Sequence, residues 1–223
     1  FLLSITHELR SPIASAKLAM QTIERKQDLP VEKTARLVSN ALVDIDRLHS
    51  LVENLLLSAK IESAAFEAGN DPVDLSALLR DAASKLQDTL GRGREFSLDV
   101  QPGILVSGDP NALLSVVYNL IENAIKYSPP ETPLALKLKV DNGLAVLRVA
   151  DEGYGVPELE RKKIFKKFYR VGNEDTRRTK GTGLGLYIVE RIVALHGGRI
   201  QVMQNEPRGT VFEVKFPKLD SYV

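Results

Sequence analysis

The stretch Asn119-Leu-Ile-Glu-Asn123-Ala-Ile-Lys126-Tyr127 holds the densest group of chemically useful side chains in this sequence. It ends an amphipathic pattern over residues 112–126 that predicts a helix. Asn119, Asn123 and Lys126 share one face of that helix. Two amide oxygens and an ammonium suit a phosphate group with Mg²⁺, and the tyrosine that ends the stretch offers a stacking surface for a base. The polar outer face of an ordinary surface helix would show the same pattern.

Two glycine-containing loops follow this helix along the chain. The first, Asp151-Glu-Gly153-Tyr-Gly155, comes directly after a predicted strand, and its glycines allow a tight turn against a ligand. Asp151 is placed to accept a hydrogen bond from an exocyclic amine, although a plain β-turn fits equally well. The second loop, Gly181-Thr182-Gly183-Leu184-Gly185, opens an apolar helix, where N–H groups favour phosphate. It matches neither a Walker A loop nor a dinucleotide fingerprint, and an ordinary glycine-rich loop remains the alternative.

The first 62 residues follow a different pattern. Apolar residues recur at helical spacing over residues 1–27 and again over residues 31–62. Asp28-Leu-Pro30 separates the two helices, which predicts an antiparallel hairpin. The second helix has a heptad seam, formed by Ala41, Ile45, Leu48, Val52, Leu55 and Ala59. Because one hairpin cannot cover its own apolar stripes, we expect two copies to pair as a dimeric four-helix bundle.

The remaining sequence predicts a mixed domain. Residues 63–72 lose the periodicity and indicate a linker. Helices are expected at 75–90, 112–126 and 186–195, and strands at 96–100, 134–140, 144–150, 199–202 and 210–216. This order favours an α/β sandwich, a sheet with one face covered by helices. The predicted class is therefore α+β, with a hairpin over 1–62, a linker over 63–72 and a second domain over 73–223.

His7 lies in the first predicted helix, about 160° around the axis from the apolar stripe. It is therefore expected to face solvent, with Glu8 beside it and Ser11 one turn later. A neutral imidazole is a usable nucleophile near neutral pH, and a neighbouring carboxylate can orient it. An ordinary exposed histidine is the alternative. His49 and His196 have no partners at metal-ligand spacing and are interpreted as structural.

Composition limits the class of protein. Thirty Lys and Arg residues against 29 Asp and Glu leave a charge of +1, which argues against a protein that mainly coats DNA or anionic membranes. The absence of cysteine excludes disulfides, thiolate metal sites and cysteine nucleophiles, and fits a reducing compartment. The basic and aromatic stretch 161–170 could suggest nucleic acid, but Ile164, Phe165 and Phe168 are expected to pack inward. We therefore predict no nucleic-acid partner.

In their order along the chain, these motifs resemble the boxes of bacterial two-component sensor histidine kinases. Phe1-Leu-Leu-Ser-Ile-Thr-His7-Glu-Leu-Arg-Ser-Pro12 resembles their phosphoacceptor box. Residues 119–127, 151–155, 164–169 and 181–186 resemble the N, G1, F and G2 boxes, so the resemblance covers nearly the whole chain. It implies a dimerisation and phosphotransfer hairpin followed by an ATP-binding domain of the Bergerat type, shared with gyrase and heat-shock-chaperone ATPases.

The resemblance also implies roles, with ATP and Mg²⁺ as cofactors. His7 would be phosphorylated, with Glu8 as its general base. Asn123 would bind Mg²⁺, Lys126 would neutralise phosphate, and Asp151 would accept the adenine amino group. The other residues of the implied nucleotide site are Asn119, Tyr127, Gly153, Gly155, Gly181, Thr182, Gly183, Leu184, Gly185 and Thr210, together with Arg177 or Arg178 from the lid predicted over 173–180.

The implied partners are a second copy of the chain and a response-regulator receiver domain, whose aspartate would take the phosphoryl group. Ser11 stands where the family usually has Thr or Asn, a position linked to dephosphorylation of the partner. Asn119 stands where the related ATPases carry a water-activating Glu, so plain hydrolysis should be slow. We expect the cytoplasmic portion of a membrane-anchored sensor. The alternatives are an ATP-binding scaffold and a Bergerat-fold ATPase without phosphotransfer.

Overall fold

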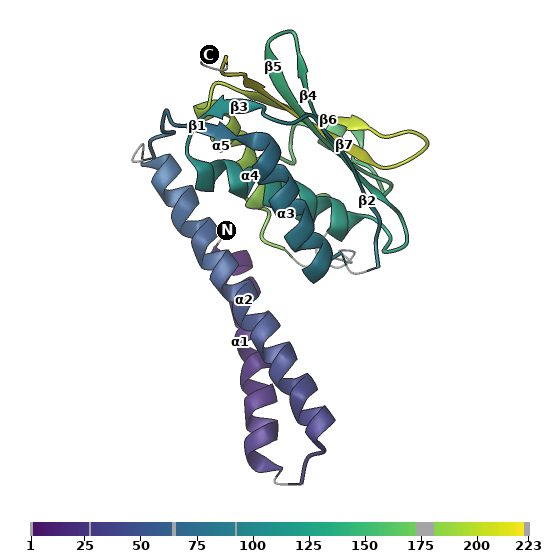
Figure 1. Cartoon of the computed structure of the whole chain (residues 1–223). Helices are drawn as coiled ribbons and strands as arrows, with labels where there is room; N and C mark the ends of the chain where they lie inside the picture. Colours follow the sequence, from purple (N-terminus) through teal and green to yellow (C-terminus); the bar gives the residue numbers. More distant parts are fainter. Residues whose placement is uncertain (1, 27, 64–65, 92, 173–180, 221–223) are drawn as a thin grey trace.

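The computed structural model describes residues 2–26, 28–63, 66–91, 93–172 and 181–220 (Figure 1). The chain begins with a helical hairpin, in which α1 (Leu2–Arg25) packs against α2 (Val31–Glu62). The turn between the two helices lies at the end of the hairpin that points away from the second domain (Figure 1). Pro30 forms the N-cap of α2, where its fixed φ and missing N–H are tolerated. The predicted hairpin is confirmed.

The hairpin leaves much of its apolar surface exposed. Of the predicted seam, Ala41 is 2% exposed, but Ile45 is 51% and Val52 is 45% exposed. Leu18, on α1, is also 65% exposed. Because the free energy falls when apolar side chains leave water, a group of exposed apolar side chains of this kind marks an interaction surface. The exposure therefore supports the predicted pairing of two hairpins.

The second part of the chain contains a five-stranded sheet. Its strand order is β2-β4-β5-β7-β6, with β2 parallel to β4 and every other pair antiparallel. The strands are β2 (Phe96–Val100), β4 (Leu134–Asp141), β5 (Leu144–Asp151), β6 (Arg199–Gln204) and β7 (Thr210–Pro217). β5 is the central strand, and its last residue is Asp151.

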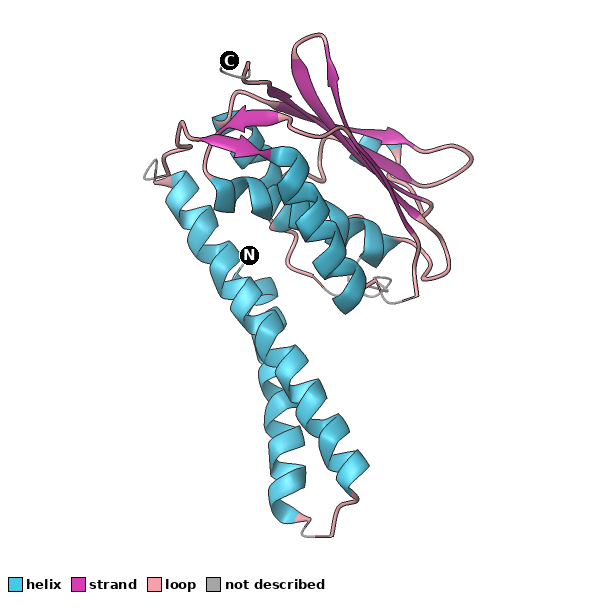
Figure 2. Cartoon of the chain, in the orientation of Figure 1, coloured by secondary structure: helices cyan, strands magenta, loops and turns pink. Residues whose placement is uncertain are grey.

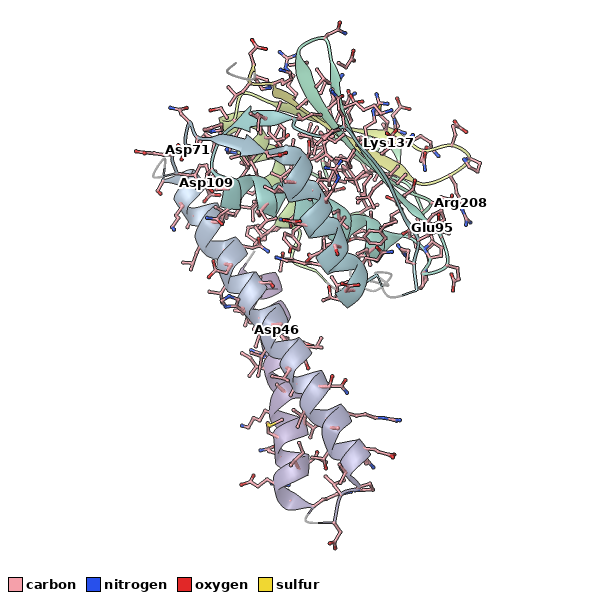
Figure 3. All side chains as sticks on the ribbon, viewed as in Figure 1. Asp46, Asp71, Glu95, Asp109, Lys137 and Arg208 are labelled. Carbon is pink, nitrogen blue, oxygen red and sulfur yellow. The ribbon has the colours of Figure 1, made fainter. Side chains whose placement is uncertain are left out.

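Three helices cover one face of this sheet (Figure 2). They are α3 (Leu75–Thr89), α4 (Pro110–Tyr127) and α5 (Gly185–Leu195). Leu120, Leu147 and Ile188 are fully buried between the two layers. Asp109 caps α4 by accepting a hydrogen bond of 2.7 Å from the N–H of Ala112 (Figure 3). The predicted α/β sandwich is confirmed.

Some elements differ from the sequence prediction. Two strands, β1 (Pro72–Asp74) and β3 (Leu105–Ser107), form a small antiparallel sheet that was not predicted, because three residues are too few to show alternation. Ile164 and Phe165 are buried as expected, but they lie in turns after a short 3₁₀ helix, η1 (Glu158–Glu160). In the part of the chain that the structure describes, no helix has the length and apolar character to cross a membrane.

His196 has the structural role predicted for it. It is 9% exposed, and its Nδ1 lies 2.7 Å from the carbonyl oxygen of Ile192. Its Nε2 accepts a hydrogen bond of 3.2 Å from the N–H of Asp109. The second of these contacts joins the end of α5 to the start of α4. His49 is exposed on α2.

Candidate functional site

A cavity of about 620 Å³ lies between α4, α5, the adjoining ends of β5 and β7, and α2. Its volume falls in the range of small-molecule sites in proteins. The predicted site residues that line it are Asn119, Asn123, Lys126, Tyr127, Asp151, Gly155, Gly181, Thr182, Gly183, Gly185 and Thr210. Segments far apart in the sequence therefore meet at one cavity, as the order of the motifs predicted.

Asp151 forms the buried end of the cavity. Its side chain is acceptor-only when ionised, and the residue is 3% exposed. Its Oδ1 accepts hydrogen bonds from the N–H groups of Gly153, at 2.7 Å, and Thr210, at 3.3 Å. Burial raises the pKa of Asp151 above that of an ordinary aspartate, and these backbone hydrogen bonds and the nearby guanidinium of Arg94 oppose part of that rise. The site thus holds a fixed carboxylate where a ligand amine can be recognised.

The loop around Asp151 is packed too closely for side chains at two glycines. A Cβ at Gly153 would overlap the carbonyl oxygen of Tyr127, and one at Gly209 would overlap that of Asp151. The N–H of Tyr154 also points to the Tyr127 carbonyl oxygen, at 3.4 Å. Gly153 is therefore buried behind the cavity wall, and Gly209 is a close-approach residue that the sequence motifs missed.

The opposite end of the cavity joins the polar face of α4 to the glycine loop. The amide of Asn119 donates to the carbonyl of Ser115 at 2.8 Å, and its Oδ1 would lie 2.5 Å from a Cβ placed on Gly185. A Cβ at Gly181 would overlap the Nζ of Lys126. Two of the glycines thus face polar side chains of α4 directly, which supports a shared site for an anionic ligand.

Residues before and after the undescribed segment 173–180 are joined by hydrogen bonds. The N–H of Phe168 donates to the carbonyl of Gly183 at 2.9 Å, and Nη1 of Arg170 donates to the carbonyl of Gly181 at 2.9 Å. Leu184, one of the predicted site residues, is fully buried in the core instead of lining the cavity. Arg177 and Arg178 lie outside the described residues.

The hairpin also contributes to the cavity. Ser50, Leu51 and Asn54 of α2 line it, although nothing in their pattern distinguished them from other residues of the helix. His7 and Glu8 lie on the backbone of α1, and Ser11 is exposed there. Ser11 is not among the lining residues, and the side chains of His7 and Glu8 lie outside the described part of the structure.

Comparisons with known proteins agree with this arrangement. Residues 108–220 match the histidine kinase-, DNA gyrase B- and HSP90-like ATPase family, and residues 1–64 match the His Kinase A (phospho-acceptor) domain. The phosphate regulon sensor protein PhoR of Pseudomonas aeruginosa is 30% identical over 97% of this chain and 49% of its own length. The probable sensor histidine kinase TcrY of Mycobacterium tuberculosis is 35% identical over 97% of this chain and 45% of its own length.

Two solved structures are similar over nearly the whole chain. Full-length ShkA in complex with AMPPNP has a TM-score of 0.71 and 28% identity, covering 100% of this chain and 46% of that one. The histidine kinase AdeS of Acinetobacter baumannii has a TM-score of 0.69 and 27% identity, covering 96% of this chain and 98% of that one. The present chain spans about half the length of the curated relatives PhoR and TcrY.

Proposed function

Because the chain belongs to the histidine kinase-, DNA gyrase B- and HSP90-like ATPase family, as the catalytic core of a two-component sensor histidine kinase, we propose that it transfers the γ-phosphoryl group of ATP to its own His7. The observation that supports this most directly is the cavity, which has a buried carboxylate at one end and amide, ammonium and glycine groups at the other. These two ends match the adenine and the triphosphate of ATP.

At the adenine end, the Asp151 carboxylate accepts a hydrogen bond from the exocyclic amine. Tyr127 faces the base, and Gly155 and Thr210 complete the wall. The structure of ShkA was determined with AMPPNP, an adenine nucleotide, which favours the same class of ligand here.

At the phosphate end, Asn123 binds Mg²⁺ and Lys126 neutralises phosphate charge. Within the described ranges, no group of three or more His, Cys, Asp or Glu side chains is placed to hold a metal ion. A side-chain amide oxygen is a ligand type that Mg²⁺ accepts, so Asn123 would hold the ion when nucleotide is bound. When bound, Mg²⁺ supplies charge neutralisation on the phosphates. Gly181, Thr182, Gly183 and Gly185 line the same end of the cavity, where their N–H groups would meet the phosphates. The resemblance assigns contact with the γ-phosphate to Arg177 or Arg178, which lie outside the described residues.

In the transfer step, a ring nitrogen of His7 attacks the γ-phosphorus in line. A nitrogen–phosphorus bond forms, the bond to the β–γ bridging oxygen breaks, and ADP leaves. Glu8 orients the imidazole and accepts its proton. Asn119 cannot act as a base for water, so plain hydrolysis of ATP is slow.

The family supports dimerisation and a response-regulator partner in general. For this chain we propose hairpins that pair through the seam, a receiver-domain aspartate that takes the phosphoryl group from His7, and a docking surface for that domain on the exposed face around His7. The proposed domain limits are 1–62 for the hairpin, 63–72 for the linker and 73–223 for the ATP-binding domain. The cytoplasmic side of the membrane is the proposed location.

The test is incubation with ATP labelled at the γ-phosphate. The parent chain should acquire acid-labile label, and His7→Gln should lose it while still binding nucleotide. His49→Gln, which changes an exposed histidine of the other helix, is the matched control and should label normally. Label that persists in His7→Gln would contradict the assignment.

The same experiment separates the alternatives. Tight ATP binding without phosphohistidine would indicate a nucleotide-binding scaffold, and release of inorganic phosphate without labelled protein would indicate an ATPase. Addition of candidate receiver domains, with transfer of label from this chain to one of them, tests the proposed partner.

A further inference from the structure

Arg94 is a buried arginine outside every motif described above. It immediately precedes Glu95, labelled in Figure 3, and is 6% exposed. Its Nη1 donates to Oγ of Ser128 at 2.7 Å, and its Nη2 donates to the carbonyls of Ser128, at 3.1 Å, and Pro129, at 2.5 Å. Its Nε donates to the carbonyl of Pro130 at 3.3 Å. One guanidinium thus contacts three consecutive residues after α4.

These contacts supply hydrogen-bond donors to residues 128–130, the connection that follows α4. The last carbonyls of a helix have no partners within the helix, and the negative end of its dipole lies there. Pro129 and Pro130 have no N–H to donate. A buried guanidinium, with a rigid fork of donors, satisfies several carbonyls at once and places a positive charge at the helix end. Arg94 therefore helps to hold the end of α4, together with Thr132, whose N–H and hydroxyl also donate to the carbonyl of Pro129, at 3.1 and 2.8 Å.

The end of α4 is also part of the adenine site. Tyr127 is its last residue, and its carbonyl oxygen packs against Gly153 and faces the N–H of Tyr154. Gly153 in turn donates to Asp151. A displacement of residues 128–130 would therefore be transmitted through Tyr127 to the loop that holds the carboxylate.

Arg94 acts on Asp151 through charge as well. Burial of Asp151 favours its neutral form, and the guanidinium opposes this by favouring the ionised form. Other ionisable residues line the same cavity, and Glu152 is adjacent to Asp151 in sequence; the lining ones are Glu122, Lys126, Tyr127, Tyr154, Tyr169 and Arg170. The positive charge of Arg94 lowers the pKa of Asp151 and so opposes the effect of burial.

We propose that Arg94 is a positioning residue for the adenine end of the nucleotide site. It helps to hold the end of α4, against which the loop 151–155 packs, and its positive charge acts on Asp151. The proposal rests on the proposed function, because it assumes that Asp151 recognises adenine.

The test compares Arg94→Met and Arg94→Lys with the parent chain. Arg80→Met is the matched control, because Arg80 also donates to a backbone carbonyl, that of Val100 at 2.6 Å, but is exposed on α3 and does not line the cavity. ADP affinity is measured by calorimetry from about pH 5 to about pH 8, with circular dichroism to establish folding. Asp151→Asn is measured in parallel.

Arg94→Met should weaken ADP binding about tenfold at neutral pH. Because the pKa of Asp151 rises further without the guanidinium, the loss of affinity on acidification should also begin at a higher pH than in the parent. Arg94→Lys keeps the charge but cannot contact all three residues, so its affinity should fall while its pH profile stays near that of the parent. Arg80→Met should match the parent throughout.

A folded Arg94→Met chain with parental affinity and pH profile would overturn the proposal. If Arg94→Met does not fold, the test rests on Arg94→Lys. An ADP affinity of Arg94→Lys equal to that of the parent would then overturn the proposal. Weak binding in Asp151→Asn with parental binding in both Arg94 variants would reject the role of Arg94 alone. A parent chain that does not bind ADP would instead reject the proposed function, and with it this inference.

Discussion

The carboxylate of Glu62, the last residue of α2, accepts a hydrogen bond of 2.6 Å from the Nζ of Lys167 in the second domain. The same oxygen accepts a hydrogen bond of 3.1 Å from the hydroxyl of Tyr187 in α5. Lys167 precedes the segment 173–180, and Tyr187 follows it. One side chain of the hairpin therefore contacts the chain on both sides of the predicted lid.

The first prediction concerns the pH dependence of this contact. The hydrogen bonds from Lys167 and Tyr187 lower the pKa of Glu62. The contact should therefore be fully present above the ordinary pKa of a glutamate and disappear as the pH falls through the lowered value. Glu62→Gln should reduce hydrogen-exchange protection at the start of α5 at neutral pH, and the parent should show this loss only in acid.

Glu53→Gln is the control for that experiment, because Glu53 is an exposed glutamate of the same helix. Its protection factors, corrected for intrinsic exchange rates, should equal those of the parent. Equal protection in Glu62→Gln and the parent at neutral pH would show that the contact does not hold the two parts together.

The second prediction compares two glycines with the same backbone conformation. Gly183 has φ +71° and Gly103 has φ +69°, so alanine at either position should cost about 1 kcal/mol of folding free energy. A Cβ at Gly183 would also lie 2.8 Å from the backbone of Phe168 and Tyr169, whereas one at Gly103 would have open space. Gly183→Ala should therefore lose both stability and ATP affinity, and Gly103→Ala only some stability, in thermal unfolding and nucleotide titrations. Equal losses of stability and of ATP affinity in the two variants would show that close packing at Gly183 does not matter for the site.

The third prediction concerns dimerisation. Ile45→Glu places a charge within the exposed apolar seam and should convert a dimer to monomers in analytical ultracentrifugation, because burial of an unpaired charge is costly. Leu159→Glu changes a residue of the second domain that is 85% exposed and should leave the dimer intact. A dimer that survives Ile45→Glu would show that the seam is not the interface.

The fourth prediction concerns the metal. Asn123→Ala removes the proposed oxygen ligand and should abolish the Mg²⁺-dependent part of ATP affinity, measured with and without a chelator. Asn111→Ala changes an exposed asparagine at the start of the same helix and should retain it. Mg²⁺-dependent binding that is unchanged in Asn123→Ala would remove this residue from the metal site.

Local patterns predicted most of the fold, because periodicity reports which face of an element is buried. The helix α2 has the predicted bounds, and the five strands of the large sheet lie where alternation or apolar runs placed them. The cavity residues were predictable for a related reason. Glycines and polar side chains at fixed spacing, such as Asn119 and Gly185, meet because the elements that carry them pack together.

Contacts between residues distant in sequence were not predictable. Arg94 follows Arg92 in a glycine-containing stretch, where basic residues suggest only solvent exposure, and its partners are more than thirty positions away. Glu62 is an ordinary charged residue at a helix end until the second domain places Lys167 beside it. Ser50 and Asn54 line the cavity only because α2 lies against that domain. Such roles depend on tertiary packing, which leaves no local pattern.

The wall that α2 contributes to the cavity has a thermodynamic consequence. Ser50, Leu51 and Asn54 border the same space as Asp151. Nucleotide affinity and the position of the hairpin are therefore thermodynamically coupled. A shift of α2 that weakens ATP binding by some factor must itself be opposed by bound ATP by that same factor. Nucleotide binding therefore shifts the position of the hairpin to the same extent that the position of the hairpin shifts nucleotide binding.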